Sequence, residues 1–180
     1  MATESALAIL LQSALTAGLT ARGLTATVQK NQQPRQQGVP SAAVILFHHV
    51  GTVNVGWPYR GDVWNAISGK FDHTEIQRRE SRYQIGALSP QSPSDPTLPT
   101  PADFCLAMAA VMQSDVTRSA LLAANVGVQH ITDIRSTYFV DDKDQNQESP
   151  SFDVVLSHQD SFVTAGSQIN AITPAVKTVL

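Results

Sequence analysis

The chain has 180 residues, a single cysteine (Cys105) and few charged side chains. One cysteine cannot form a disulfide within the chain, which excludes the disulfide-stapled scaffolds of small secreted proteins and fits folding in a reducing cytoplasm. Lysine and arginine number 12 and aspartate and glutamate 15, so the formal net charge is −3. Dedicated nucleic-acid-binding domains usually carry a basic excess, so this balance argues against one.

Long apolar runs are also missing. We find none of the length needed to cross a bilayer, and the N-terminal stretch lacks the basic start of a signal peptide, so we expect no membrane association. Charged residues make up only 15% of the chain, and uncharged polar residues take their place. Such a surface can be buried against another protein with little desolvation of charge, which favours an assembly subunit.

Signatures of catalysis and of metal or cofactor binding are absent as well. The sequence has no P-loop, no G-x-G-x-x-G and no G-x-S-x-G elbow. His48 and His49 are neighbours on a predicted strand, so their side chains point to opposite faces and do not share a ligand. The segment from Asp142 loosely resembles a calcium loop, but Gln147 stands where that loop needs glycine. We therefore expect no metal, no cofactor and no enzymatic activity, and a buried structural thiol at Cys105.

Two regions have the periodicity of amphipathic helices. The first covers about residues 3–21, with Thr3 as its N-cap and Gly23 as its stop. The second begins after Thr100, its predicted N-cap, and breaks into a shorter helix over residues 115–124.

Between and after these helices, alternating or apolar runs predict strands at residues 24–30, 41–50, 74–88, 128–140 and 152–157. Residues 41–50 are apolar on both faces, which predicts a central strand whose first half is covered on both sides. Residues 60–73 are expected to form a loop or the tip of a long hairpin, and residues 141–151 an acidic connector. The chain is therefore predicted to be α+β, with a mixed or antiparallel sheet of about five strands packed by an N-terminal helix and a central helix or helix pair.

We expect a single domain over residues 1–158 and a C-terminal extension over 159–180, which is irregular or docks on a neighbour. Within the domain, prolines recur at every third residue over residues 89–101. This is the period of polyproline II and indicates a stiff, extended strap. A Pro-rich docking ligand is the alternative interpretation.

The predicted strand over residues 74–88 carries polar side chains on both faces, as an edge strand or one face of a subunit contact does. Arg78 and Arg82 are expected to share a face, with Glu80 between them. This mixture of signs suits salt bridges within the sheet or between subunits better than contacts with nucleic-acid phosphates. Arg78, Arg79, Glu80 and Arg82 therefore form a candidate inter-subunit interface.

The order of elements and the closing strand pair, GVQHITDIRSTYFVDD followed by SPSFDVVLSH, resemble the neck or tail-terminator proteins of tailed bacteriophages. The resemblance covers roughly residues 5–158. It implies a homo-oligomeric ring, commonly a hexamer, that caps the head-proximal end of the tail tube, joins it to the neck or portal complex and lets DNA pass. A contractile tail would add a sheath as partner, and the protein would enter the virion after synthesis in the host cytoplasm.

The resemblance also indicates which segments would contact stacked rings. These are residues 31–38 and 60–73, with the candidate contacts Arg35, Arg60, Trp64 and Lys70. Two alternatives remain open. One is another head–tail connector or head-completion ring protein, and the other is a monomeric protein that binds a small ligand or nucleic acid.

Overall fold

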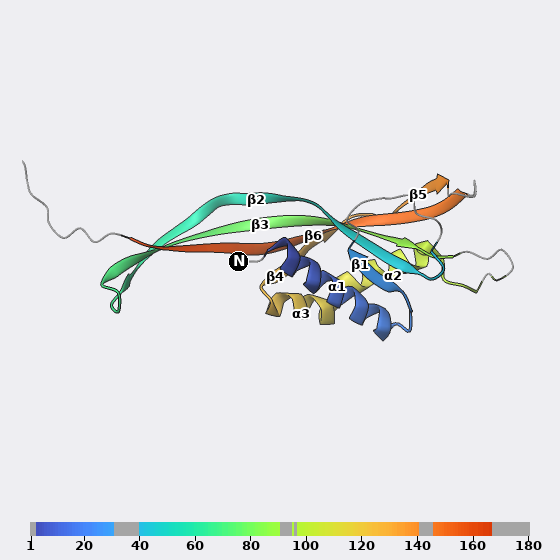
Figure 1. Cartoon of the computed structure of the whole chain (residues 1–180), viewed down its shortest axis with the longest axis horizontal. Helices are drawn as coiled ribbons and strands as arrows, with labels where there is room; N and C mark the ends of the chain where they lie inside the picture. The colour runs from blue at the N-terminus through green and yellow to red at the C-terminus, as the bar shows by residue number, and fades with distance from the viewer. Residues whose placement is uncertain (1–2, 31–39, 91–94, 96, 141–145, 167–180) are drawn as a thin grey trace, which may run out of the picture.

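The computed structural model describes residues 3–30, 40–90, 95, 97–140 and 146–166. These residues form helices and strands in the order α1 (Glu4–Ala21), β1 (Thr27–Lys30), β2 (Val44–Asn65), β3 (Lys70–Leu88), α2 (Pro101–Gln113), α3 (Asp115–Ala123), β4 (Val126–Ile131), β5 (Arg135–Val140) and β6 (Asn146–Ala165). The predicted α+β class is confirmed, and so is the break between the two central helices (Figure 1).

The strands form one mixed sheet in the order β1-β2-β3-β6-β4, with β5 also paired to β6. β1 runs parallel to β2, and the other pairs are antiparallel. The single strand predicted over residues 128–140 is in fact two strands, because β4 and β5 pair with different stretches of β6. Thr132 lies between β4 and β5, where the chain passes from one part of β6 to the other. Its hydroxyl accepts the Asp153 backbone N–H at 2.8 Å.

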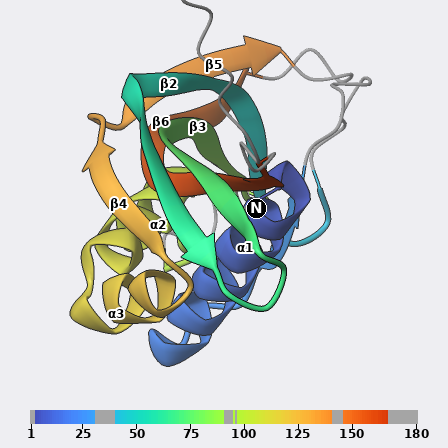
Figure 2. The same ribbon diagram turned by 90° about the vertical axis from the view of Figure 1, so that its left-hand side faces the viewer.

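The helices lie on one side of the sheet, as the view along its length in Figure 2 shows. The hydrophobic core between them is built from side chains of α1, α2 and the facing side of the strands, with Leu11, Phe47, Tyr83, Met108 and Phe152 among its fully buried members. This layer is the one that the amphipathic helices predicted.

β2 lies inside the sheet between β1 and β3, as predicted. The expectation that the first half of the strand over residues 41–50 is covered on both sides is wrong. Ile45 and Phe47 face the helices and are fully buried, whereas Leu46 and His48 on the other face are only half-buried because no helix covers that side.

The helix ends follow the predicted capping residues. The Thr3 hydroxyl accepts a backbone N–H of the first turn of α1 at 3.2 Å. Thr100 and Asp103 form a capping box, in which each side chain accepts the backbone N–H of the other residue, at 3.1 and 2.8 Å. Gly23 (φ +68°) and Asn125 (φ +58°) adopt the left-handed conformation just past α1 and α3.

α1 is 18 residues long with a mean hydropathy of 1.2, so length and composition alone would let it cross a membrane, contrary to our expectation. Its apolar residues Leu7, Leu11, Leu15 and Leu19 are buried in the core of the fold. In this structure α1 is therefore a core helix.

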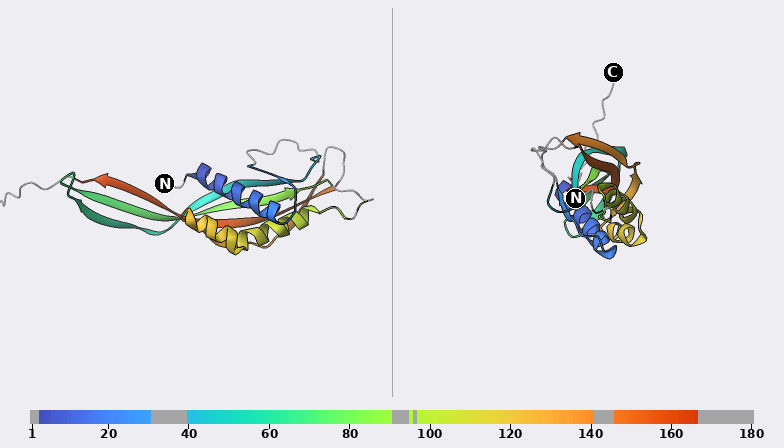
Figure 3. Two further views of the ribbon diagram at one scale, coloured as in Figure 1. Left: turned by 90° about the horizontal axis from the view of Figure 1, so that it is seen from below. Right: turned by 90° about the vertical axis from the view of Figure 1, so that its right-hand side faces the viewer.

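Beyond the helices, β2, β3 and β6 continue together as a three-stranded projection (Figures 1 and 3). We call it the β-arm and define it as residues 53–65 of β2, 70–80 of β3 and 159–165 of β6. The turn at residues 66–69 forms its tip, where the Gly69 N–H donates to the Asn65 carbonyl at 2.9 Å.

The β-arm and the β5–β6 pair correct three sequence-based boundaries. Residues 60–73 do contain the tip of a long hairpin, but all except 66–69 are strand. Residues 146–151 were expected in a connector and 159–165 in an irregular tail, yet both belong to β6. Their strand conformation comes from pairing with β5 and β3, which local propensity does not encode.

Several predicted segments lie outside the described residues. They include residues 31–38, residues 141–145 and most of the extension beyond Ala165. The same holds for residues 91–94 and 96 of the Pro-rich segment, so its polyproline II conformation stays a prediction. The domain boundary at residue 158 is also still a prediction.

Candidate assembly interface

The four residues of the candidate interface divide between the two faces of β3. Arg78, Glu80 and Arg82 lie on the face turned away from the helices, because side chains alternate along a strand. Arg78 Nη2 lies 3.7 Å from Glu80 Oε1 and donates to Gln129 Oε1 at 3.2 Å. Arg82 is exposed. The structure thus brings these three residues together, as predicted.

Arg79 lies on the opposite face and is occupied within the chain. Its guanidinium forms an ion pair with Asp160 of β6 at 3.0 Å, and the Asp160 side chain is only 12% exposed. The sequence could not distinguish this internal pair from one between subunits. Whether any of the four residues contacts a neighbour stays a prediction.

A chain of polar contacts, half-buried at His49, exposed at Thr52 and buried at Ser81 and His158, links the strands where the β-arm leaves the body. His49 Nε2 lies 2.8 Å from the Thr52 hydroxyl, which lies 2.8 Å from the Ser81 hydroxyl, and that hydroxyl lies 3.0 Å from His158 Nε2. Burial, and next the charge of Arg79, lower the pKa of His158, while Asp160 acts in the opposite direction. A neutral imidazole is therefore favoured at this position.

The Ser81–His158 contact has the spacing of a nucleophile and its base. However, Ser81 is 2% and His158 5% exposed, so substrate atoms do not reach them. His158 Nδ1 is buried without a hydrogen-bond partner, so no carboxylate orients the ring. Within the described residues there is also no group of three or more potential metal ligands. The pair is a structural link between β3 and β6.

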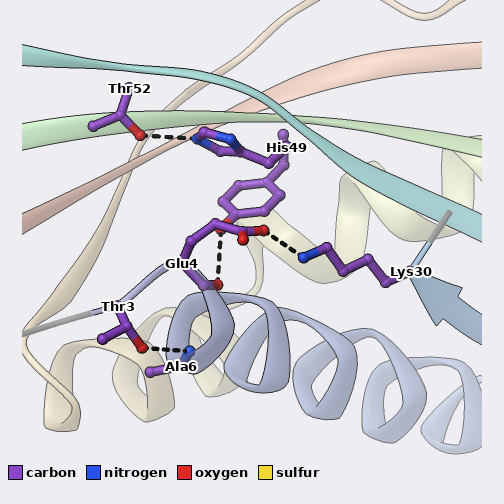
Figure 4. A network of polar contacts seen from close by, with 7 residues as sticks. Thr3, Glu4, Ala6, Lys30, His49 and Thr52 are labelled. Atoms are coloured by element: carbon purple, nitrogen blue, oxygen red, sulfur yellow. Dashed lines mark hydrogen bonds and ion pairs between the residues drawn. The ribbon is translucent and has the colours of Figure 1, made fainter. Parts of the chain in front are cut away.

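The N-terminus of α1 is fastened to the sheet beside this polar chain (Figure 4). Glu4 forms an ion pair with Lys30 of β1 at 2.5 Å, and its backbone carbonyl accepts the Tyr83 hydroxyl at 3.3 Å. Burial raises the pKa of Tyr83 to about 12, and the charge of Glu4 adds to this effect. The β-arm therefore starts from a base held by both layers of the fold.

One face of the β-arm, which we call the charge-pair face, continues the helix-covered side of the sheet. It carries a cross-strand ion pair of Arg60 with Glu75, at 2.9 Å, and a cross-strand hydrogen bond between Asp62 and His73. Nearer the tip, the rings of Trp64 and Phe71 meet edge to face with centroids 5.1 Å apart. These are the complementary pairs that stabilise neighbouring strands.

The other face, which we call the apolar face, carries β-branched and aromatic side chains. Arg78 and Glu80 lie on this same face of the sheet. Val53, Tyr59, Val63 and Val163 are 58–66% exposed there. At its base a hollow of about 340 Å³ is lined by residues that include Val53, Val155, Glu80 and Arg82. The apolar strip thus ends against two of the candidate interface residues.

The residues predicted to contact stacked rings lie on the β-arm and not on a free loop. Arg60 and Trp64 belong to β2, and Lys70 begins β3 directly after the turn. Arg35 lies outside the described residues.

The two most exposed apolar side chains of the arm are Trp57 (95%) and Ile67 (100%), and no pattern in the sequence indicated the exposure of Ile67. The alternation of Val53, Val55 and Trp57 indicates that the strand over residues 41–50 can continue into the arm. Gly51, Gly56 and Pro58 weaken that signal.

A family model described as "E217 gateway protein gp29" matches residues 6–167, which are 162 of the 180 residues. No curated protein matches. A solved structure titled "Cryo-EM Structure of an Extracellular Contractile Injection System, PVC sheath/tube terminator in extended state" is 12% identical with a TM-score of 0.41. The alignment covers 96% of this chain and 64% of that chain, so the present chain spans less than two thirds of that protein.

The family match confirms the resemblance to structural proteins of bacteriophage tails. Because it extends over nine tenths of the sequence, the chain belongs to the bacteriophage family of the E217 gateway protein gp29.

Proposed function

We propose that the chain assembles into a homo-oligomeric ring, a hexamer, at the head-proximal end of a phage tail. The ring joins the tail tube to the neck or portal complex and lets DNA pass through its centre. A sheath is a further partner if the tail contracts. The description of the family as a gateway protein supports a position on such a passage.

The exposure of apolar side chains on both faces of the β-arm carries this proposal. Trp57, Tyr59, Val63, Ile67 and Phe162 are each at least 65% exposed. Monomeric proteins rarely expose large contiguous apolar patches, and where such a patch occurs it usually serves binding. A three-stranded sheet that extends past its helices cannot bury these side chains itself, so a protein partner covers them.

The charge of the chain favours a ring through which DNA slides, rather than a protein that binds DNA tightly. Basic contacts to phosphates dominate the affinity of proteins for DNA. The net charge is −3, and Arg60 and Arg79 are already engaged in ion pairs. Little positive charge is therefore left to hold DNA that slides through the ring. DNA is therefore expected to pass without sequence-specific binding.

The test is a phage in which expression of the chain is switched off. Full heads and separate tails, seen by electron microscopy and rejoined when the chain is supplied in trans, are the expected result. Heads that have lost their DNA beside normal tails would favour the head-completion alternative. Joined, infectious virions without the chain would refute the proposal and favour a monomeric accessory protein.

The candidate interface is tested in the same complementation assay. The double variant Arg78→Glu and Arg82→Glu should fold but fail to join tails, because it makes the base of the apolar face uniformly acidic. Arg118→Glu, an exposed arginine on α3, is the matched control and should complement normally. Normal joining by the double variant would remove these residues from the interface.

A further inference from the structure

Both outer strands of the β-arm have an open edge. β2 pairs with β1 only over residues 44–47, so from residue 48 onward its outer side has no strand partner among the described residues. β4 and β5 cover β6 only as far as His158, which leaves residues 159–165 open on the side away from β3. Open edges expose rows of unpaired backbone N–H and C=O groups that another strand can pair with.

The two open edges match in length and direction. A register shift between Val55 and Tyr59 interrupts β2, so its regular arm portion is residues 59–65. This portion and residues 159–165 of β6 are each seven residues long. Because both strands are antiparallel to β3, they run parallel to each other.

We propose that these edges pair with each other across a subunit boundary, so that residues 159–165 of one copy lie beside residues 59–65 of the next. The occupant of each open edge is therefore a second copy of this chain. A contact between two different edges is heterologous and continues from copy to copy until rotation closes a ring. This inference rests on the ring proposed above and names the contact that builds it.

The side chains at the two edges are compatible in this arrangement. When the arms lie side by side with their faces aligned, Val163 of one copy falls in the same face as Tyr59 and Val63 of the next. Phe162 falls in the charge-pair face with Trp64 of the next copy. The apolar strip thus becomes continuous between subunits and covers part of the area that each monomer exposes.

Charge also favours a second copy as the partner. Of the charged residues of the two edges, Arg60 and Asp160 already have oppositely charged partners within the arm, and Asp62 is hydrogen-bonded to His73. Arms that meet edge to edge therefore bring together paired charges and not an excess of one sign. A strongly charged partner would have to break these pairs or leave its own charge unmatched.

Cysteine pairs test the contact. The chain's own Cys105 is fully buried and does not interfere. Val63→Cys combined with Val163→Cys places one thiol on each edge of the apolar face, and Tyr59→Cys with Val163→Cys covers a shifted register. Two strand spacings, about 10 Å, separate the two edges within one arm, too far for an internal disulfide.

The variants are supplied to the phage that lacks the chain, and assembled tails are oxidised and run on a non-reducing gel. We expect at least one double variant to form a ladder of covalent multimers up to the full ring. The corresponding single variants stay monomeric alone, and a mixture of the two gives dimers. Ile67→Cys, fully exposed at the arm tip, reports random collisions as dimers and should stay monomeric.

Dimers from Val63→Cys or from Val163→Cys alone would overturn the inference, because they would show like edges paired. Tails that contain both double variants yet give no multimers would also overturn it while leaving the ring intact. If the wild-type chain is missing from joined tails, the proposed function itself fails. These three outcomes are distinguishable on one set of samples.

Discussion

Gly18 offers the sharpest test of how the helical layer is packed. It lies in the interior of α1, where a glycine destabilises a helix by about 1 kcal/mol relative to alanine. A β-carbon at this position would lie 2.2 Å from Val111 Cγ1 and 2.5 Å from Val111 Cγ2 on α2. Val111 is itself 2% exposed and has little room to move.

Gly18→Ala is therefore expected to lower the free energy of unfolding, although helix propensity alone predicts a gain. Forcing a methyl group into a filled core costs about 1–3 kcal/mol, and contacts this short with two methyl carbons fall at the upper end. Subtracting the gain in helix propensity leaves a net loss of about 2 kcal/mol. Urea unfolding followed by circular dichroism, at unchanged m-value, measures it.

Val111→Ala provides the matched control. Alone it should lose about 2 kcal/mol, because it leaves a small cavity. Combined with Gly18→Ala, it removes the two carbons that clash, so the double variant should be more stable than the sum of the single effects by about 3 kcal/mol, the overpacking cost that is relieved. A stabilised Gly18→Ala variant, or strictly additive effects, would refute the close approach of α1 to α2.

Two titratable groups give further predictions. Burial raises the pKa of the Cys105 thiol to about 12, so DTNB at pH 8 should label it in urea and not in the native protein; rapid native labelling would contradict the buried position. The pKa of His158 is lowered in the fold, so its contribution to stability is complete above the ordinary value of 6.5 and is lost as pH falls below it. His158→Gln should flatten this decline in unfolding experiments between pH 7 and 5, and an unchanged pH profile would show that another group causes it.

The helix boundaries were predictable because capping chemistry is local. Thr3, Thr100 and Gly23 each act on backbone groups within a turn of their own position, and such signals can be read without knowing what the helix packs against. The resemblance to phage tail proteins was based on the order of helices and strands along the chain, and the family match confirms it.

The β-arm was only partly predictable because its stability comes from pairing between segments. Residues 60–65 are polar enough to indicate a loop when taken alone. Aligned in reverse against residues 70–75, they place Arg60 opposite Glu75 and Trp64 opposite Phe71. A search for complementary residues across the turn would have found the hairpin, whereas a propensity window along one strand does not.

The structure separates the four candidate interface residues into one that is paired within the chain and three that form a group on the other face, which the sequence could not establish. Arg79 is turned toward Asp160, which leaves Arg78, Glu80 and Arg82 as a polar group at the base of the apolar face. Stable protein interfaces combine an apolar centre with a polar rim, and this face has both parts in one continuous surface. Because the charge-pair face satisfies its own polar pairs, the neighbouring subunit of the proposed ring would gain more from covering the apolar face. Charge reversal at Arg78 and Arg82 should therefore disturb assembly more than removal of Arg60, which loses only an exposed pair.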